Sequence, residues 1–180
     1  MTKNSYEEVA ISFTSGSLSV ERVSVPEGTF FLATMPGYDV SNNPGAPQLP
    51  QLAKLLQIPV CDSIIATIVN AEFKEYDAAD LGIDYPLFPS QPSVSKSSVN
   101  PPFVYDQGIY STDTFYALPL VSVEKAGVRR DIALANVYVS PVQYNPVSGR
   151  IRIYTSIDVE FTFVNADMSA TQRLDQYASP

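Results

Sequence analysis

The sequence predicts an all-β protein built as an antiparallel β-sandwich, with one short helix or helical turn near residues 47–57 and a long Pro/Ser-rich loop at 86–102. Three observations predict this class. Several segments alternate apolar and polar residues with a period of two. Aromatic residues make up 11% of the chain and charged residues 17%, against roughly 25% charged in an average domain. Proline occurs 15 times in 180 residues, which favours strands and ordered loops over helices.

The first forty residues predict three strands. Val9, Ile11 and Phe13 fall on one face of an extended segment. A second segment covers residues 18–23, and residues 29–35 read as a more buried strand. Turn residues separate these segments, namely Gly16, Pro26, Gly28, Pro36 and Gly37.

The next stretch contains four leucines with helical spacing, at Leu49, Leu52, Leu55 and Leu56. Because Pro50 and Pro59 bracket only about two turns, we predict one short helix or an irregular turn that packs its leucines on the core. Residues 61–76 then predict a strand in which neither parity is cleanly polar. A strand that is apolar on both faces is typical of the middle of a sheet, so we expect a central strand there.

The C-terminal third predicts a hairpin over residues 140–163. Residues 145–149 (Asn-Pro-Val-Ser-Gly) supply the turn, and Ile157, Val159, Phe161 and Phe163 alternate strictly. Apolar density falls from Asn165 onward, which indicates a short exposed tail. In total we expect eight to ten short strands, forming a single sandwich domain over 1–164 followed by a C-terminal tail over 165–180.

The composition restricts the function classes. The chain has no histidine and one cysteine, Cys61, which excludes a Ser-His or Cys-His couple, an internal disulfide and a CxxC metal site. We therefore expect no enzyme activity, no cofactor and no metal. The formal net charge of −8 argues against nucleic acid or an anionic membrane as partner. No apolar run reaches the length of about 18 residues needed for a membrane span.

The loop at 86–102 contains five prolines and five serines. Proline removes backbone donors, so we expect an extended surface loop whose apolar margins anchor its ends while the middle projects. Lys96 is the only basic residue from Glu75 through Glu124. A single lysine on such a loop has the form of a protease-binding loop, with the ammonium entering an acidic specificity pocket. A solvated lysine in a flexible linker is the simpler interpretation, and composition alone leaves both open.

Six segments, in order, resemble the N-terminal propeptide of the gingipain family of secreted bacterial cysteine proteases, which have a caspase-like catalytic domain. These segments are 45–50, 55–59, 91–97, 102–105, 141–146 and 170–174, and the resemblance runs from about Phe13 to Arg173. The loop and the Ala-Thr-Gln-Arg sequence ending at Arg173 are most similar to the lysine-specific branch.

The resemblance implies a role and a set of site residues. It implies a β-sandwich prodomain that assists folding of the protease and keeps it latent during export. Lys96 would act as a pseudo-substrate residue in the S1 pocket, with Val94 and Ser95 leading in and Ser97 following. The sequence departs from the family pattern at 97–100, just before Pro101 and Pro102. The protease's own catalytic residues would lie elsewhere, in the caspase-like domain that we expect as partner.

The resemblance also implies a location and a processing site. We expect a secreted chain, passing through the periplasm to the cell surface or medium, whose signal peptide is absent from this sequence and whose Met1 need not be native. Arg173 could be a maturation site, and an ordinary tail arginine is the alternative. Arg129 and Arg130 could be a processing or partner site, but an exposed turn is the simpler interpretation.

Three other groups of residues favour structural roles. Cys61 is expected to be a small buried hydrophobe. Asp77, Asp80 and Asp84 are spaced somewhat like calcium ligands but lack the glycine and terminal glutamate of an EF-hand loop. Tyrosines 105, 110 and 116 could form a carbohydrate platform, although packing on a sheet is the commoner use.

Two other functions compete with the propeptide. One is a secreted β-sandwich binding or adhesion module for a glycan or protein. The other is a structural assembly domain with possible self-association through an open edge strand.

Overall fold

The structure is a computed structural model that describes residues 7–93, 102–129 and 131–177. The described part contains ten strands and three short helical segments, which follow in this order: β1 (Glu8–Thr14), β2 (Ser19–Val25), β3 (Gly28–Thr34), β4 (Asp39–Val40), β5 (Pro50–Gln57), β6 (Ser63–Asp77), η1 (Ala79–Leu81), α1 (Gln107–Tyr110), β7 (Val121–Arg129), β8 (Ile132–Val139), β9 (Val142–Asn145), β10 (Arg150–Val164) and α2 (Met168–Tyr177). The predicted antiparallel sandwich is confirmed.

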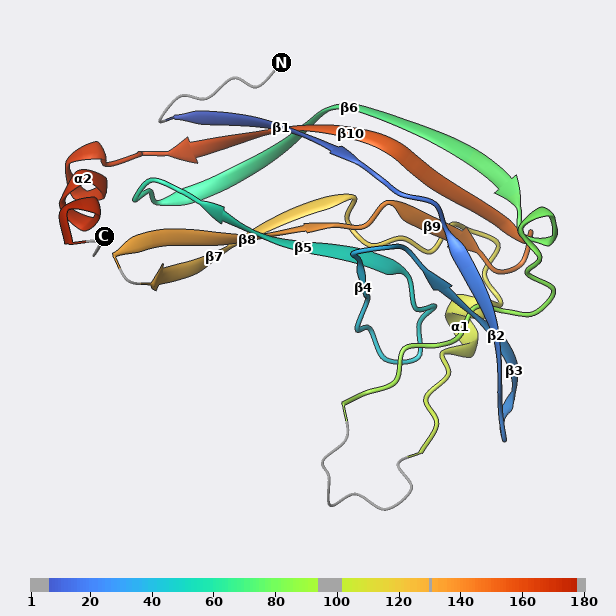
Figure 1. Ribbon diagram of the computed structural model, residues 1–180. Coiled ribbons are helices and arrows are strands. Elements are labelled where there is room, and N and C mark those ends of the chain that lie inside the picture. Colours follow the sequence, from blue (N-terminus) through green and yellow to red (C-terminus); the bar gives the residue numbers. More distant parts are fainter. Residues whose placement is uncertain (1–6, 94–101, 130, 178–180) are drawn as a thin grey trace.

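Two four-stranded antiparallel sheets form the layers (Figure 1). In the first sheet β10 lies in the middle, with β1 and β9 along one side and β6 along the other. The second sheet has the order β4-β5-β8-β7. The β2–β3 hairpin forms a separate two-stranded sheet at one end of the sandwich, and α2 lies at the opposite end (Figure 1).

Two hydrophobic clusters fill the molecule. The first packs between the two sheets and contains buried residues of β8 and β10, namely Ala135, Val137, Val139, Ile157, Val159, Phe161 and Phe163. Val9, Ile11 and Phe13 pack against it from β1, as their alternation predicts. The second joins the β2–β3 hairpin to the other end of β10, through Phe31, Ala33, Met35, Leu49, Leu87, Val142, Tyr144, Ile151 and Ile153. The predicted hairpin at 140–163 is confirmed as β9–β10, whose turn is held by the side chain of Asn145 accepting hydrogen bonds from the backbone N–H groups of Val147 and Ser148, both at 3.1 Å.

The helix predicted near 47–57 is wrong, because this stretch forms strand β5. Its backbone pairs with β8, from Leu52 opposite Val139 to Gln57 opposite Leu134. Leu52 and Leu56 pack towards the core, whereas Leu55 is 61% exposed. The helical spacing therefore does not define a buried face, and the availability of a strand partner decided the conformation.

The central position predicted for residues 61–76 is also wrong. Strand β6 pairs with β10 along one side only, and no described strand pairs with its other side. Apolar residues occur on both faces of β6 because some of them face solvent, and not because both faces are buried.

Residues 166–177 form more regular structure than the predicted exposed tail, because they include helix α2. Asp167 caps α2 by accepting a hydrogen bond from the N–H of Ala170 at 2.8 Å. The Asp167 N–H donates to the carbonyl of Val60 at 2.7 Å, and the N–H of Val60 donates to the hydroxyl of Thr171 at 2.9 Å. The start of α2 is thereby attached to the segment before β6. Among the described residues no helix is long and apolar enough to cross a membrane.

Candidate functional site

The candidate site is the base of the loop at 86–102, which we call the loop stem: residues 86–93 on one arm and 102–106 on the other. The first arm runs beside β3. The N–H of Phe31 donates to the carbonyl of Pro86 at 3.0 Å, and the N–H of Phe88 donates back to Phe31 at 2.8 Å. These bonds form an isolated parallel bridge between Phe31 and Leu87, which the proline-rich composition did not predict. Leu87 is fully buried in the second cluster.

Gly45 connects the two arms through the backbone. Its N–H donates to the carbonyl of Ser90 at 2.8 Å on one arm, and its carbonyl accepts from the N–H of Asp106 at 3.0 Å on the other. Gly45 has a φ of +85°, and a Cβ built on it would lie 3.0 Å from the Asp106 nitrogen. Glycine is therefore required here for both its backbone conformation and the close approach of the second arm.

Gln91 connects the arms through its side chain. Its amide nitrogen donates to the carbonyls of Pro89 at 3.0 Å and Val104 at 2.9 Å. Its amide oxygen accepts from the N–H of Val104 at 2.9 Å. The side chain of Gln91 thus makes hydrogen bonds between the arms of the kind that backbone groups make between paired strands. The proline-rich backbone supplies few of these itself, since proline has no N–H.

Hydrogen bonds of buried polar groups attach the first arm to neighbouring segments. The Ser90 hydroxyl donates to the carbonyl of Ser41 at 2.7 Å, and both serines are buried. The Tyr110 hydroxyl donates to the carbonyl of Leu87 at 2.6 Å. Burial raises the pKa of Tyr110 well above its ordinary value, so the phenol stays protonated and remains a donor.

Aromatic rings cover the stem on the side of the β2–β3 hairpin. The ring of Phe30 lies 5.7 Å from that of Phe88 and 5.8 Å from that of Phe103. Tyr105 stacks on Tyr110 with ring centres 4.3 Å apart. The predicted anchoring of the loop ends by apolar residues agrees with these contacts.

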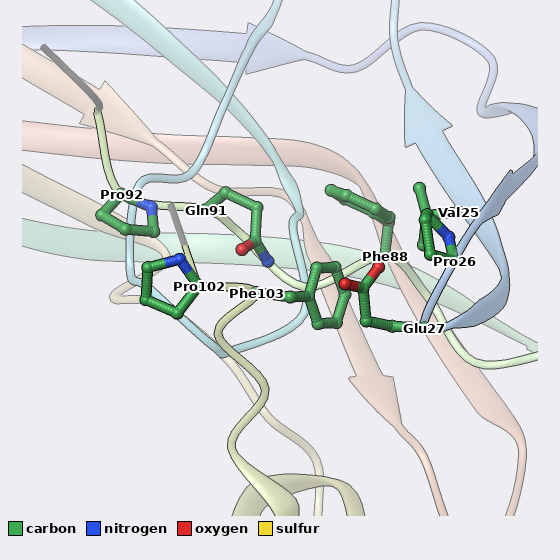
Figure 2. A pocket seen from close by; sticks show the side chains of 8 residues that line it. All are labelled: Val25, Pro26, Glu27, Phe88, Gln91, Pro92, Pro102 and Phe103. Carbon is green, nitrogen blue, oxygen red and sulfur yellow. The ribbon is translucent and has the colours of Figure 1, made fainter. Parts of the chain in front are cut away.

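A surface pocket of about 270 Å³ lies between the hairpin tip and the two arms (Figure 2). Its wall is mostly apolar, and it is lined by Val25, Pro26, Glu27, Phe88, Gln91, Pro92, Pro102 and Phe103. Five of these residues come from the arms, and Val25, Pro26 and Glu27 come from the hairpin tip (Figure 2). The described ends of the two arms therefore lie at an apolar edge of the sandwich.

The profile of the Propeptide_C25 family matches residues 3–177, nearly the whole chain. The chain belongs to the Propeptide_C25 family. Lys-gingipain of Porphyromonas gingivalis is 31% identical over 175 residues, covering 96% of this chain and 10% of the relative. Gingipain R2 of the same organism is 29% identical over 153 residues, covering 83% of this chain and 20% of the relative. The chain thus spans only a small part of these curated relatives.

Two solved structures share the fold of this Propeptide_C25 chain. One, described as giving structural insight into the zymogenic latency of gingipain K from Porphyromonas gingivalis, has a TM-score of 0.83 at 29% identity and covers 92% of this chain and 91% of that chain. The other is the complex of the pro- and mature domains of RgpB from the same organism, with a TM-score of 0.75 at 25% identity, covering 92% and 84%. The resemblance to gingipain propeptides seen in the residues is confirmed.

The predicted inhibitory residues of this Propeptide_C25 chain, Val94, Ser95, Lys96 and Ser97, lie outside the described residues. The structure describes the residues on either side of them, up to Ser93 on the first arm and from Pro102 on the second. The residues that brace these arms, Gly45 and Gln91, lie within segments that carry the family resemblance, but nothing in the sequence indicated their bridging contacts.

The other predicted residues have separate places in the fold. Arg173 is exposed on α2, at the end of the sandwich away from the stem (Figure 1). Arg129 is exposed at the end of β7, and Arg130 lies outside the described residues. Cys61 is buried and free, as expected, and burial raises the pKa of its thiol.

Neither the calcium alternative nor the carbohydrate platform is supported. Asp77 accepts a hydrogen bond from Arg150, and no group of three or more His, Cys, Asp or Glu residues in the described part could hold a metal ion. Tyr110 is buried, and the Tyr116 hydroxyl accepts a hydrogen bond from Asn43 at 3.0 Å. The three tyrosines therefore do not form one exposed surface.

Proposed function

We propose that this chain is the propeptide that keeps a lysine-specific gingipain-type cysteine protease latent, with Lys96 inserted in the S1 pocket as a pseudo-substrate. The observation that carries the proposal is the loop stem. Gly45 and Gln91 connect the two arms that flank residues 94–101 through hydrogen bonds. Membership of the propeptide family and the likeness to a gingipain K structure concerned with zymogenic latency support the same role.

The stem lowers the cost of inserting the loop. A loop that binds a cleft must lose conformational freedom, and this loss reduces affinity. The hydrogen bonds across the stem restrain the two arms, and together with the flanking prolines they would reduce this loss on binding. Inside the pocket, the Lys96 ammonium would pair with a carboxylate of the protease in a charge-assisted contact made stronger by the exclusion of water.

The loop would be cleaved slowly despite occupying the cleft. A substrate carbonyl must approach the nucleophile in a near-attack geometry. A loop whose two ends are fixed to a β-sandwich need not reach that geometry even when its lysine fills the pocket. The chain contributes no catalytic group in this scheme, which agrees with the absence of histidine.

The remaining parts of the proposal concern the partner and its setting. The partner is the caspase-like catalytic domain of the cognate protease, whose folding the propeptide also assists. The sandwich over 1–164 would make the contact, and residues 165–180 would lead towards the protease, with Arg173 as a candidate maturation site. The assembly would be exported, first to the periplasm and then to the cell surface or medium.

The direct test measures inhibition of Lys-gingipain by the 180-residue chain and by its Lys96→Ala variant. Because truncating one partner of a buried charge pair costs about 2–5 kcal/mol, the inhibition constant should rise by roughly 30-fold or more. Lys54→Ala is the matched control, since Lys54 is an exposed lysine on β5, and it should inhibit like the unmodified chain. Equal inhibition by the Lys96 and Lys54 variants would contradict the pseudo-substrate role.

The selectivity of the unmodified chain provides a second criterion. An acidic S1 pocket shaped for lysine should favour this loop over a pocket shaped for arginine. We expect stronger inhibition of Lys-gingipain than of gingipain R2, and Lys96→Arg should narrow the difference. Equal inhibition of both proteases by the unmodified chain would count against a lysine-specific partner.

A further inference from the structure

Arg173 has an exposed side chain but lies within a regular helix. Helix α2 covers Met168–Tyr177, so the residues on both sides of Arg173 have helical backbone. An endopeptidase binds the residues around the bond that it cuts as an extended segment, whose backbone groups pair with the enzyme like an added strand. A helical backbone cannot make these hydrogen bonds, because its N–H and C=O groups pair with each other along the helix axis. In the docked helix, an arginine-specific endopeptidase can therefore reach the side chain but not the peptide bond.

Helix α2 has little stability of its own. It contains ten residues, and isolated helices shorter than about 12–15 residues are marginal in water. None of the residues from Met168 to Leu174 is buried, and none belongs to either of the two hydrophobic clusters. The helix lies at the end of the sandwich (Figure 1), where its packing against the sheets is limited. Its persistence therefore depends on the hydrogen bonds that attach it to the sandwich.

Val60 provides this attachment through both of its backbone groups. Its carbonyl accepts a hydrogen bond from the N–H of Asp167 at 2.7 Å, and its N–H donates to the hydroxyl of Thr171 at 2.9 Å. The same hydroxyl donates to the carbonyl of Asp167 at 2.8 Å. One threonine hydroxyl thus completes a ring of hydrogen bonds between Val60 and the start of α2, acting as donor and acceptor at once.

Val60 is itself held independently of α2. On one side of it, the N–H of Ile58 donates to the carbonyl of Ala133 at 3.0 Å. On the other side, the ammonium group of Lys125 donates to the carbonyl of Cys61 at 2.7 Å. When the attachment breaks, the part that moves is therefore α2, and the segment around Val60 stays on the sandwich.

We propose that the bond between Arg173 and Leu174 is a cryptic cleavage site for an arginine-specific endopeptidase, and that the hydrogen bond between Thr171 and Val60 controls its exposure. Detachment of α2 lets the segment become extended and enter a protease cleft. The step is hydrolysis: the C–N bond breaks, and water adds its hydroxyl to the Arg173 carbonyl carbon and a proton to the Leu174 nitrogen. The opening is a property of this chain alone, whereas its meaning for maturation rests on the proposed function.

The first test compares the intact chain with a peptide that cannot form the attachment. Trypsin, which cuts after arginine and lysine, is the probe, and mass spectrometry follows release of residues 174–180 from the 180-residue chain and from a synthetic peptide of residues 167–180. Because cleavage requires the open form, the peptide should be cut at least about tenfold faster. Equal rates for the peptide and the chain would overturn the proposal.

Two substitutions at Thr171 isolate the hydroxyl. Valine has nearly the shape and helix propensity of threonine but no hydroxyl, and serine keeps the hydroxyl. Thr171→Val should raise the rate of cleavage after Arg173 roughly fivefold to tenfold, which corresponds to about 1.0–1.4 kcal/mol for one hydrogen bond. Thr171→Ser should be cut at nearly the rate of the unmodified chain. Peptides with the same substitutions correct for any direct contact of residue 171 with trypsin, and equal corrected rates for both variants would contradict control by the hydroxyl.

A second bond and a second measurement separate local opening from global unfolding. Lys54 lies on β5 and pairs with Val137 of β8, so cleavage after Lys54 requires the sandwich to open. Thr171→Val should leave that cleavage unchanged. In amide hydrogen exchange, the amides of α2 should exchange faster by the same factor as the cleavage, and those of β10 should not change. Faster cleavage at both positions, or unchanged exchange in α2, would refute the proposal. Neither measurement involves Lys-gingipain, so their outcome is separate from that of the Lys96→Ala test.

Discussion

The loop stem and strand β6 satisfy their backbones in opposite ways. The stem has little regular pairing, yet Gly45 and Gln91 connect its two arms by hydrogen bonds, and Tyr110 donates a hydrogen bond to the first arm. Strand β6 is fifteen residues long and pairs with β10 along one side, with two register shifts, yet no described strand pairs with its other side. Regular secondary structure and fixed position are thus separate properties. The stem has many individual restraints, whereas β6 has one edge that no described strand pairs.

The difference in burial between the two regions should give the largest effect. Leu87 of the stem is fully buried, and Leu87→Ala should lower the free energy of unfolding by about 2–5 kcal/mol because it leaves a cavity. Ile65 of β6 is half exposed, so Ile65→Ala should cost only about 1 kcal/mol. Urea unfolding at low protein concentration measures both. Equal losses would mean that the outer part of β6 is as well packed as the stem.

The close approach at Gly45 should give an intermediate effect, and Gly37 is its matched control. Both have positive φ, +85° and +78°, but a Cβ at Gly37 would meet nothing within 4 Å. Gly37→Ala should therefore cost only the backbone term of about 1–2 kcal/mol. Gly45→Ala should cost roughly 1–3 kcal/mol more, because the new methyl group displaces the second arm.

Inhibition of Lys-gingipain distinguishes the two glycine variants further. Gly45→Ala should weaken inhibition by displacing one support of the loop, whereas Gly37→Ala should not. If both variants unfold at the same urea concentration and inhibit alike, the backbone contact between Gly45 and Asp106 does not brace the loop.

The pH dependence should give the smallest effect, and it concerns the restrained end of β6. Hydrogen bonds from Arg152 and Arg150 lower the pKa of Glu75. A carboxyl group with a lowered pKa in the folded state stabilises the fold above its unfolded pKa of about 4.3, and this contribution is lost as the pH falls through the folded value. The unfolding free energy, measured between about pH 2 and pH 6, should therefore fall less steeply for Glu75→Gln than for the unmodified chain. Identical slopes would show that these exposed ion pairs do not contribute.

The period-two pattern was sufficient to predict much of the fold. Val9, Ile11 and Phe13 pack on the core from one face of β1, and Ile157, Val159, Phe161 and Phe163 are buried on one face of β10. Strict alternation specifies both the strand and its buried side, so few other structures fit it. The stretch at 49–56 carried a weaker pattern that fits a helix or a strand. Its pairing with β8, about eighty residues later in the chain, decided between them.

The candidate site was predictable in outline only. The apolar residues at the loop's margins predicted anchored ends, and the ring contacts of Phe88 and Phe103 with Phe30 agree, whereas the middle of the predicted loop lies outside the described residues. The contacts that hold the arms join distant segments, since Gly45 forms hydrogen bonds with residues 90 and 106. No local sequence pattern predicts such contacts. The same limit explains why a central position was wrongly predicted for β6. An apolar residue looks the same in the sequence whether it contacts a neighbouring strand or solvent.

Strand β10 crosses both hydrophobic clusters. Ile151 and Ile153 belong to the cluster near the loop stem, and Ile157, Val159, Phe161 and Phe163 belong to the cluster between the sheets. Neither cluster can lose its packing without releasing a strand that also supports the other. The consequence is thermodynamic coupling, and the described domain should unfold as a single cooperative unit. A destabilising substitution at the end near α2 should therefore also lower the stability of the end that carries the loop stem.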